Sequence, residues 1–291
     1  MKVCGFTFVR NAVRYDYPVV ESIRSILPVC DEVVVAVGDS TDDTLELVNS
    51  IGSPKVRIIR TVWDEALREG GRVLAVETDK ALDAVATDAD WALYIQADEV
   101  LHEDGHAALL ASMQRWKDGP EVEGLLFDYR HFYASYGLVG DSRRWYRREV
   151  RAVRPGIGIR SWRDAQGFRK NGRPLQVRLA NAVMHHYGWV KPPEKQQAKQ
   201  RSFNKLWHDD AWVDEHHNAN TVAFDYSGID SVAPFTGKHP APMQTRVDRM
   251  DWHVHVDPDR KHLSLKNRFL QALERLTGWR VGEYRNYRLL R

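Results

Sequence analysis

Residues 1–133 alternate between short apolar runs and segments with helical spacing, and this alternation constrains the fold more than any other feature. The run Glu32–Val37 is continuous and β-branched, which is typical of a strand buried on both faces of a parallel sheet. Similar runs at Lys2–Val9, Val56–Thr61, Trp91–Ile95 and Gly124–Tyr133 predict four more strands. Strand and helix in strict alternation imply an α/β fold with a mostly parallel central sheet and helices on both faces.

Helical spacing of apolar residues fills the intervals between these runs. It predicts helices at about 18–27, 44–51, 74–85 and 104–116. Pro18 suits a first helical turn, and Asp104 is a natural N-cap. Each predicted helix therefore connects one predicted strand to the next.

The second half of the chain differs in kind. Its stretch 143–178 holds twelve Arg and Lys residues against two acids, and glycines divide it into short pieces that read as hairpins with a mostly solvated surface. Gln176–Ala182 reads as a strand, and helices are expected at about 194–207 and 263–276. We therefore divide the chain into an α/β domain at 1–133 and an α+β region at 134–291 that ends in a basic tail.

Composition excludes several classes of protein. The chain is 43% hydrophobic and 28% charged, which is ordinary for a folded protein and unlike a disordered one. A net charge of +2 gives no reason to expect a nucleic-acid partner, and two cysteines exclude a Cys₄ zinc site or a disulfide scaffold. The sequence lacks a P-loop, a GxGxxG after its first strand and a GxSxG motif.

Targeting signals are also missing from the sequence. No apolar run approaches the roughly 18 residues that a membrane span needs, and the N-terminus lacks the pattern of a signal peptide. We therefore expect a cytoplasmic protein with no transmembrane segment, which leaves peripheral membrane contact open.

Four segments lie at the carboxyl ends of the predicted strands, and three of the four are rich in polar oxygen groups. They are Arg10–Asn11, the loop Gly38–Thr44, Trp63–Glu65 and Gln96–Glu99. Because ligands of parallel sheets bind at the carboxyl ends of strands, these residues are candidates for one site. Capping of the next helix is the alternative role for Ser40, Thr41 and Asp42.

Asp98 and Glu99 form a pair of hard oxygen ligands suited to Mg²⁺ or Mn²⁺. Alternation along the strand predicts that Gln96 and Asp98 face the cleft, while Ala97 and Glu99 face away. His186, in a segment that ends His-His-Tyr-Gly-Trp, could complete a metal site, and a packed, hydrogen-bonded histidine is the alternative. The arginine-rich stretch suits bidentate binding of phosphate better than nucleic acid.

The order of these motifs resembles that of family 2 glycosyltransferases, whose nucleotide-sugar-binding domain has the GT-A fold. The family's strand ending in Arg-Asn is matched by Arg10–Asn11, and its Ser-Thr-Asp loop by Ser40–Thr44. Its aromatic strand and Asp-x-Asp-Glu motif are matched by Trp91–Ile95 and Gln96–Glu99. A His-Tyr-Gly segment at 186–188 is a looser match, and the resemblance covers little of residues 208–291.

The resemblance implies a transferase that moves a sugar from a nucleotide-diphosphate donor to the hydroxyl of a glycan or small-molecule acceptor. It implies inversion at the sugar carbon and help from Mn²⁺ or Mg²⁺, with residues 1–133 binding the donor and residues 134–291 facing the acceptor. Metal ligands would be Asp98 and His186, and the catalytic base would be Asp164. Donor contacts would come from Arg10, Asn11, Asp39, Ser40, Asp42, Gln96 and Ala97.

Two positions depart from the family pattern. Gln96 replaces the first Asp of Asp-x-Asp, and Val37–Gly38 stand where an acid usually reads the base of the nucleotide. The donor nucleotide therefore stays open. A sugar- or anion-binding protein on a decayed transferase scaffold and a nucleotidyltransferase remain alternatives.

Overall fold

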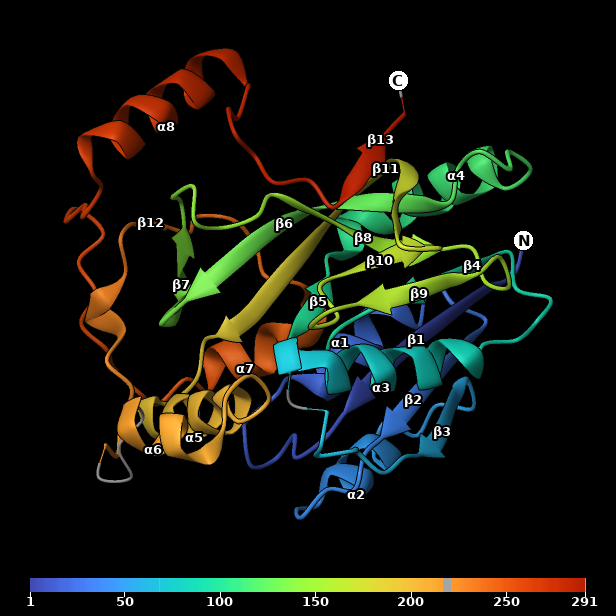
Figure 1. Cartoon of the computed structure of the whole chain (residues 1–291), viewed down its shortest axis with the longest axis horizontal. Coiled ribbons are helices and arrows are strands. Elements are labelled where there is room, and N and C mark those ends of the chain that lie inside the picture. The colour runs from blue at the N-terminus through green and yellow to red at the C-terminus, as the bar shows by residue number, and fades with distance from the viewer. Residues whose placement is uncertain (68, 217–220, 291) are drawn as a thin grey trace.

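The computed structural model describes residues 1–67, 69–216 and 221–290, and it has an α/β fold (Figure 1). The strands are β1 (Val3–Val9), β2 (Glu32–Val37), β3 (Val56–Arg60), β4 (Trp91–Tyr94), β5 (Glu99–Leu101), β6 (Gly124–Tyr133), β7 (Ser135–Gly140), β8 (Arg148–Val153), β9 (Ile159–Trp162), β10 (Gly167–Lys170), β11 (Arg173–Trp189), β12 (Val232–Pro234) and β13 (Tyr287–Leu289). The α-helices are α1 (Val19–Ile26), α2 (Thr44–Asn49), α3 (Arg72–Asp83), α4 (His106–Trp116), α5 (Pro193–Asn204), α6 (Asp210–His216), α7 (Gln244–Asp248) and α8 (Leu265–Thr277).

One mixed sheet runs through the molecule in the order β3-β2-β1-β4-β8-β6-β11-β10-β9. Its first four strands are all parallel, as the alternation of strands and helices predicts. β8 enters antiparallel between β4 and β6, and β11 then lies parallel to β6. The predicted α/β class is confirmed, and strands from beyond residue 133 complete the same sheet.

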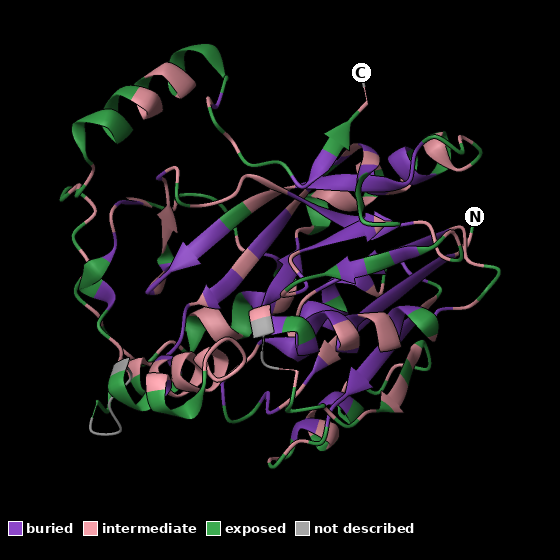
Figure 2. Ribbon diagram, in the orientation of Figure 1, coloured by how far each residue is buried: buried purple, intermediate pink, exposed green. Residues whose placement is uncertain are grey.

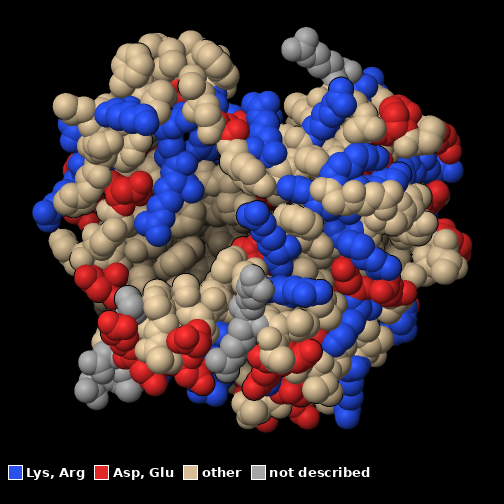
Figure 3. All heavy atoms as spheres, viewed as in Figure 1, with Lys and Arg blue, Asp and Glu red and all other residues tan. Residues whose placement is uncertain are grey.

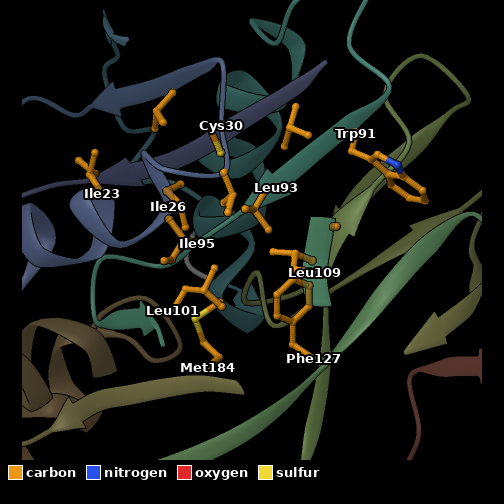
Figure 4. Close-up of a cluster of buried hydrophobic side chains, with 14 of the residues drawn as sticks. Ile23, Ile26, Cys30, Trp91, Leu93, Ile95, Leu101, Leu109, Phe127 and Met184 are labelled. Atoms are coloured by element: carbon orange, nitrogen blue, oxygen red, sulfur yellow. The ribbon is translucent and has the colours of Figure 1, made fainter. Parts of the chain in front are cut away.

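Helices cover both faces of this sheet (Figure 2). α1, α2 and α4 pack on one face, and α3 packs on the other. Figure 4 shows part of the first core, a buried cluster that includes Ile23 and Ile26 of α1, Leu93 of β4 and Leu109 of α4. Burial of each such side chain contributes about 1.5–3 kcal/mol.

The switch in strand order positions the site. From β1 the chain passes through α1 to β2 on one side, and from β3 it passes through α3 to β4 on the other. The carboxyl ends of β1 and β4 are therefore neighbours at the point where the order reverses, which is where parallel sheets form a crevice.

β11 is longer than expected. It continues past Ala182 to Trp189, with a register shift between Leu179 and Val183 where Asn181 has a φ of 56°. His186 therefore lies within a central strand, paired with Glu99 of β5 and His131 of β6. This pairing is what brings the second half of the chain to the end of β4.

Several arginines of the basic stretch 143–178 form contacts with other parts of the protein, so the stretch is not only a solvated surface. Arg151 is completely buried, which corrects the expectation of a solvated surface at this position. Arg147 forms two hydrogen bonds to Glu283, and Arg173 forms two to Glu123. These arginines therefore join the hairpins to distant segments.

Candidate functional site

A cavity of about 450 Å³ lies at the carboxyl ends of β1 and β4. Seven of the residues predicted for a site line it: Arg10, Asn11, Gln96, Ala97, Asp98, Asp164 and His186. Its wall is completed from α5 by Lys199, Gln200, Ser202 and Phe203. The two halves of the chain thus build one cavity.

Asp98 lies at the polar end of the cavity and is 9% exposed. Its Oδ2 accepts a hydrogen bond from Nζ of Lys199 at 3.1 Å, and its Oδ1 lies 3.8 Å from Nε2 of His186. Burial raises the pKa of Asp98, but the nearby bases Lys199, His186 and Lys191 together outweigh burial and hold that pKa below its ordinary value. The carboxylate is therefore ionised and faces two basic side chains.

Hydrogen bonds behind His186 fix which of its nitrogens carries the proton. His131 Nε2 lies 2.8 Å from the carbonyl oxygen of Tyr146, and a carbonyl only accepts, so His131 is protonated there. Burial lowers the pKa of both histidines, so each carries a single proton. Nδ1 of His131 therefore accepts from Nδ1 of His186 at 3.2 Å, which leaves Nε2 of His186 with a free lone pair beside Asp98.

This pair of donors fits a divalent cation. A carboxylate oxygen and an unprotonated imidazole nitrogen are ligands that Mn²⁺ accepts, and a hydrogen bond to the other ring nitrogen is the usual support of a ligating histidine. Across the residues that the structure describes, no group of three or more His, Cys, Asp or Glu is arranged for a metal. Phosphate oxygens of a ligand would complete the shell, as is usual for Mg²⁺.

Gly188 keeps the space in front of these donors free. A Cβ at this position would lie 2.7 Å from Nε2 of His186 and 2.9 Å from Oδ2 of Asp98. The carbonyl oxygen of Gly188 accepts a second hydrogen bond from Lys199 at 2.9 Å. The glycine therefore both opens the site and holds the lysine.

Tyr17 carries two ammonium groups against its ring. Nζ of Lys199 lies 5.0 Å from the ring centroid, and Nζ of Lys191 lies 4.7 Å from it. Lys191 is fully buried, and burial together with the charge of Lys199 lowers its pKa to about 7. Of the two, Lys199 lines the cavity, so the polar end of the cavity is suited to an anion as well as to a cation.

Glu99 is excluded from the cavity, as predicted. Ala97 was also expected to face away but lines the cavity, because residues 97–98 form a turn between β4 and β5 rather than a continuing strand. Its side chain is fully buried and forms hydrogen bonds to Arg151 at 2.8 and 2.9 Å. Tyr129 donates a further hydrogen bond to it at 2.7 Å, and the backbone N–H of Gln96 donates another at 3.1 Å. Glu99 therefore holds the end of β4 in place.

Gln96 lines the cavity and is bonded to a distant turn. Its Nε2 donates to the carbonyl oxygen of Ala165 at 3.3 Å, a bond that an aspartate could not make because it has no donor. Asp164 precedes this alanine and lines the cavity, and burial raises the pKa of Asp164. The amide thus connects β4 to the turn that carries Asp164.

An aromatic end of the cavity lies beside Arg10. The guanidinium of Arg10 is 5.4 Å from the ring centroid of Trp63 and forms an ion pair with Asp39 at 3.3 Å. The rings of Trp63 and Phe8 are 5.8 Å apart, and both line the cavity. The cavity therefore presents an aromatic ring and a charged guanidinium side by side to a ligand.

Three residues that were predicted to contact the sugar donor form hydrogen bonds within the protein instead. Ser40 accepts from the backbone N–H of Asn11 at 3.0 Å, and Asn11 accepts from that of Thr41 at 2.8 Å. Asp42 accepts from the N–H groups of Arg14 and Thr44. Asp39, Ser40 and Asp42 do not line the cavity. Ser40 and Asp42 join the loops after β1 and β2, and neither is the N-cap of α2, which is Asp43.

Lys199 and His131 are the site residues that sequence reasoning missed. Lys199 lies in a polar helix rich in Lys and Gln, where no spacing distinguishes it from its neighbours. His131 shares one face of its strand with Tyr129 and Tyr133, and this alternation could have indicated a buried polar row.

Comparisons with known proteins find likenesses among solved structures alone, since no family model and no curated protein matches the chain. Residues 1–349 of S. aureus TarS in complex with UDP are 20% identical over 45% of this chain and 36% of that chain, with a TM-score of 0.33. Another structure of S. aureus TarS 1–349 is 13% identical over 74% of this chain and 69% of that chain, with a TM-score of 0.39.

A third likeness is to glucosyl-3-phosphoglycerate synthase from Mycobacterium tuberculosis in complex with Mn²⁺, UDP and phosphoglyceric acid. It is 19% identical over 45% of this chain and 43% of that chain, with a TM-score of 0.28. The chain thus spans less than half the length of the UDP-bound TarS and synthase chains. Its similarity to these proteins is low in both sequence identity and TM-score.

Proposed function

We propose that the cavity binds a nucleotide-diphosphate sugar and transfers the sugar, with inversion, to the hydroxyl of a glycan or small-molecule acceptor. The observation that carries this proposal is the grouping of Asp98, His186 and Lys199 at the end of β4, below a cavity large enough for such a donor. A diphosphate leaving group gains negative charge as its bond to the sugar breaks, so cationic groups at this point stabilise the transition state.

Each residue has a role in binding or charge stabilisation. Lys199 presents a fixed ammonium to the diphosphate, and Arg10 with Trp63 holds the nucleoside at the other end of the cavity. Asp98 and His186 would hold a divalent cation, Mn²⁺ or Mg²⁺, which when bound supplies Lewis-acid stabilisation of the leaving diphosphate.

Asp164 is the proposed base of the transfer step. Its carboxylate takes the proton of the acceptor hydroxyl while the acceptor oxygen bonds to the sugar carbon. The bond from that carbon to the phosphate oxygen breaks, and its electron pair leaves with the diphosphate. Burial raises the pKa of Asp164, which makes its carboxylate a stronger base.

Calorimetric titration with a panel of nucleotide sugars, with and without Mn²⁺, tests donor binding. We expect one donor to bind more tightly with Mn²⁺, and Asp98→Asn to remove that difference. Asp88→Asn, which changes a carboxylate that is 71% exposed, is the matched control and leaves binding unchanged. Tight binding without any turnover would favour the binding-protein alternative.

Asp164→Asn tests the base separately. Its donor affinity stays that of wild type because the residue acts on the acceptor, and the rate of transfer falls about 10²- to 10⁴-fold. A full transfer rate in this variant would assign the base to another group.

A further inference from the structure

An apolar stripe runs along the outward face of α8. Leu265, Phe269, Ala272 and Leu276 follow one another at helical spacing and therefore lie on one face of the helix. Leu265 is 83% exposed, Phe269 is 68% exposed and Leu276 is 85% exposed. Figure 2 shows α8 at the edge of the molecule with most of its surface exposed.

The opposite face of α8 is held against the protein. Gln271 donates to the carbonyl oxygen of Asp141 at 2.6 Å, and Glu274 accepts from Arg143 at 2.7 Å. Arg280, directly after the helix, is nearly buried and also pairs with Glu274. These contacts fix the rotation of the helix, so the apolar stripe points outward.

The exposed charged side chains of the segment 263–290, which contains the stripe, are basic. Residues 263–290, all of which the structure describes, contain two acids, Glu274 and Glu283. Their side chains are 18% and 12% exposed, and both form ion pairs with arginines. Exposed bases in this segment are Lys266, Arg268, Arg275, Arg285 and Arg288. Figure 3 shows α8 as a largely uncharged surface bordered by Lys and Arg.

Two aromatic residues extend the surface beyond the helix. Trp279 is 62% exposed and Tyr284 is 73% exposed. Aromatic rings with one polar atom favour the boundary between water and hydrocarbon. Within the described residues, no helix has both the length and the apolarity needed to cross a bilayer.

We propose that α8 and the segment to Arg288 form a docking surface for an anionic lipid bilayer. The stripe would lie among the headgroups and upper acyl chains, with Lys266, Arg268 and Arg275 on lipid phosphates. Membrane docking is independent of the proposed transferase activity.

Charge favours a lipid surface over a second copy of the chain. Pairing of α8 with α8 across a two-fold axis would place Arg268 and Arg275 of the two copies close together. The two acids of this segment face inward, and Asp141, the ion-pair partner of Arg275 at 3.6 Å, is only 18% exposed, so such an interface would bring like charges together. An anionic bilayer matches both the stripe and its basic border.

A second cavity lies on the inward side of the proposed docking surface. A cavity of about 290 Å³ lies behind α8 and is lined by Gln271 and Glu274 of the helix together with Arg143 and Tyr146. Tyr146 also lines the donor cavity. The two cavities therefore share Tyr146 as a lining residue.

Vesicle co-sedimentation of the full chain tests the proposal. We expect binding to vesicles of equal parts phosphatidylglycerol and phosphatidylcholine, weakening with salt, and little binding to phosphatidylcholine alone. The triple variant Leu265→Ser, Phe269→Ser, Leu276→Ser and the double variant Arg268→Glu, Arg275→Glu each bind about tenfold or more weakly.

Matched controls change similar residues elsewhere. Val62→Ser replaces an apolar side chain that is 72% exposed, and Arg24→Glu reverses an exposed charge on α1, so both leave vesicle binding unchanged. Circular dichroism melting shows whether each variant folds. Equal binding to both kinds of vesicle, or wild-type binding by the triple variant, would overturn the proposal. So would sedimentation equilibrium showing a wild-type dimer that the triple variant breaks, with no vesicle binding.

Discussion

Adjacent carboxylates at the end of β4 have opposite environments. Asp98 faces the cavity and Lys199, whereas Glu99 faces Arg151 inside the protein. A turn between β4 and β5 produces this division: Asp98 lies in the turn and faces the cavity, whereas Glu99 begins β5 and faces the interior. At the scale of single residues, the carboxylate of Asp98 can therefore contact a ligand, while the carboxylate of Glu99 stabilises the fold.

Glu99→Gln should be strongly destabilising. The change leaves the fully buried guanidinium of Arg151 without its charge partner, which costs about 3–5 kcal/mol of unfolding free energy. Urea denaturation of the variant and wild type measures this loss. Glu32→Gln is the matched control, because its ion pair with Arg57 is partly exposed and contributes less than about 1 kcal/mol. Equal losses in the two variants would contradict the assigned role of Glu99.

The loops after β1 and β2 are held together by side chains that sequence analysis assigned to the donor. Asp42 accepts hydrogen bonds from two backbone N–H groups, those of Arg14 and Thr44, at 2.7 and 3.1 Å. At the scale of elements, Asp42 therefore fastens the loop after β1 to the start of α2.

Asp42→Ala tests this structural role. The loss of a cap-like acceptor should lower the unfolding free energy by about 1 kcal/mol and leave donor affinity within about twofold of wild type. Thermal melting and donor titration measure the two quantities. A large loss of donor affinity with unchanged stability would return Asp42 to the binding site.

Several elements could be predicted from the sequence, and others could not. β2 and β6 begin and end where their apolar runs predict. β8 was missed because Arg148, Glu149 and Arg151 interrupt its apolar pattern, and these charges are tolerated in the sheet only through partners from other segments. β5 has three residues, too few for a pattern to be read.

Those parts of the candidate site that depend on residues close together in the sequence could be predicted. The carboxyl ends of β1 and β4 place Arg10, Gln96 and Asp98 in one crevice. The contact of Lys199 with Asp98 depends on the position of α5, and the contact between His131 and His186 depends on the pairing of β6 with β11. No local sequence pattern contains either of these.

At the scale of the whole molecule, the titration of Glu149 makes the free energy of unfolding depend on pH. Burial raises its pKa to about 7, although Arg151 and Asn286 act in the opposite direction. Between its ordinary pKa near 4.5 and about 7, the folded protein keeps a proton that the unfolded chain has lost. The free energy of unfolding therefore falls as pH rises through this interval.

Glu149→Gln should remove this part of the pH dependence. The variant should be about 1–3 kcal/mol less sensitive than wild type to a change from about pH 5 to about pH 8. Gln166 and Asn286, which bond the carboxylate, can rotate their amides to satisfy the glutamine. Urea denaturation at both pH values measures the difference, with the exposed Glu121→Gln as control. An unchanged slope would place the titration on another group.

Release of a nucleoside diphosphate from nucleotide sugars tests the proposed transferase most directly, because water can replace the unknown acceptor. With Mn²⁺ present, wild-type protein should release diphosphate from one donor of a panel, and Asp98→Asn should lower kcat about 10²-fold or more. Asp88→Asn should keep the wild-type rate. No release from any donor, or equal rates for wild type and Asp98→Asn, would contradict the account.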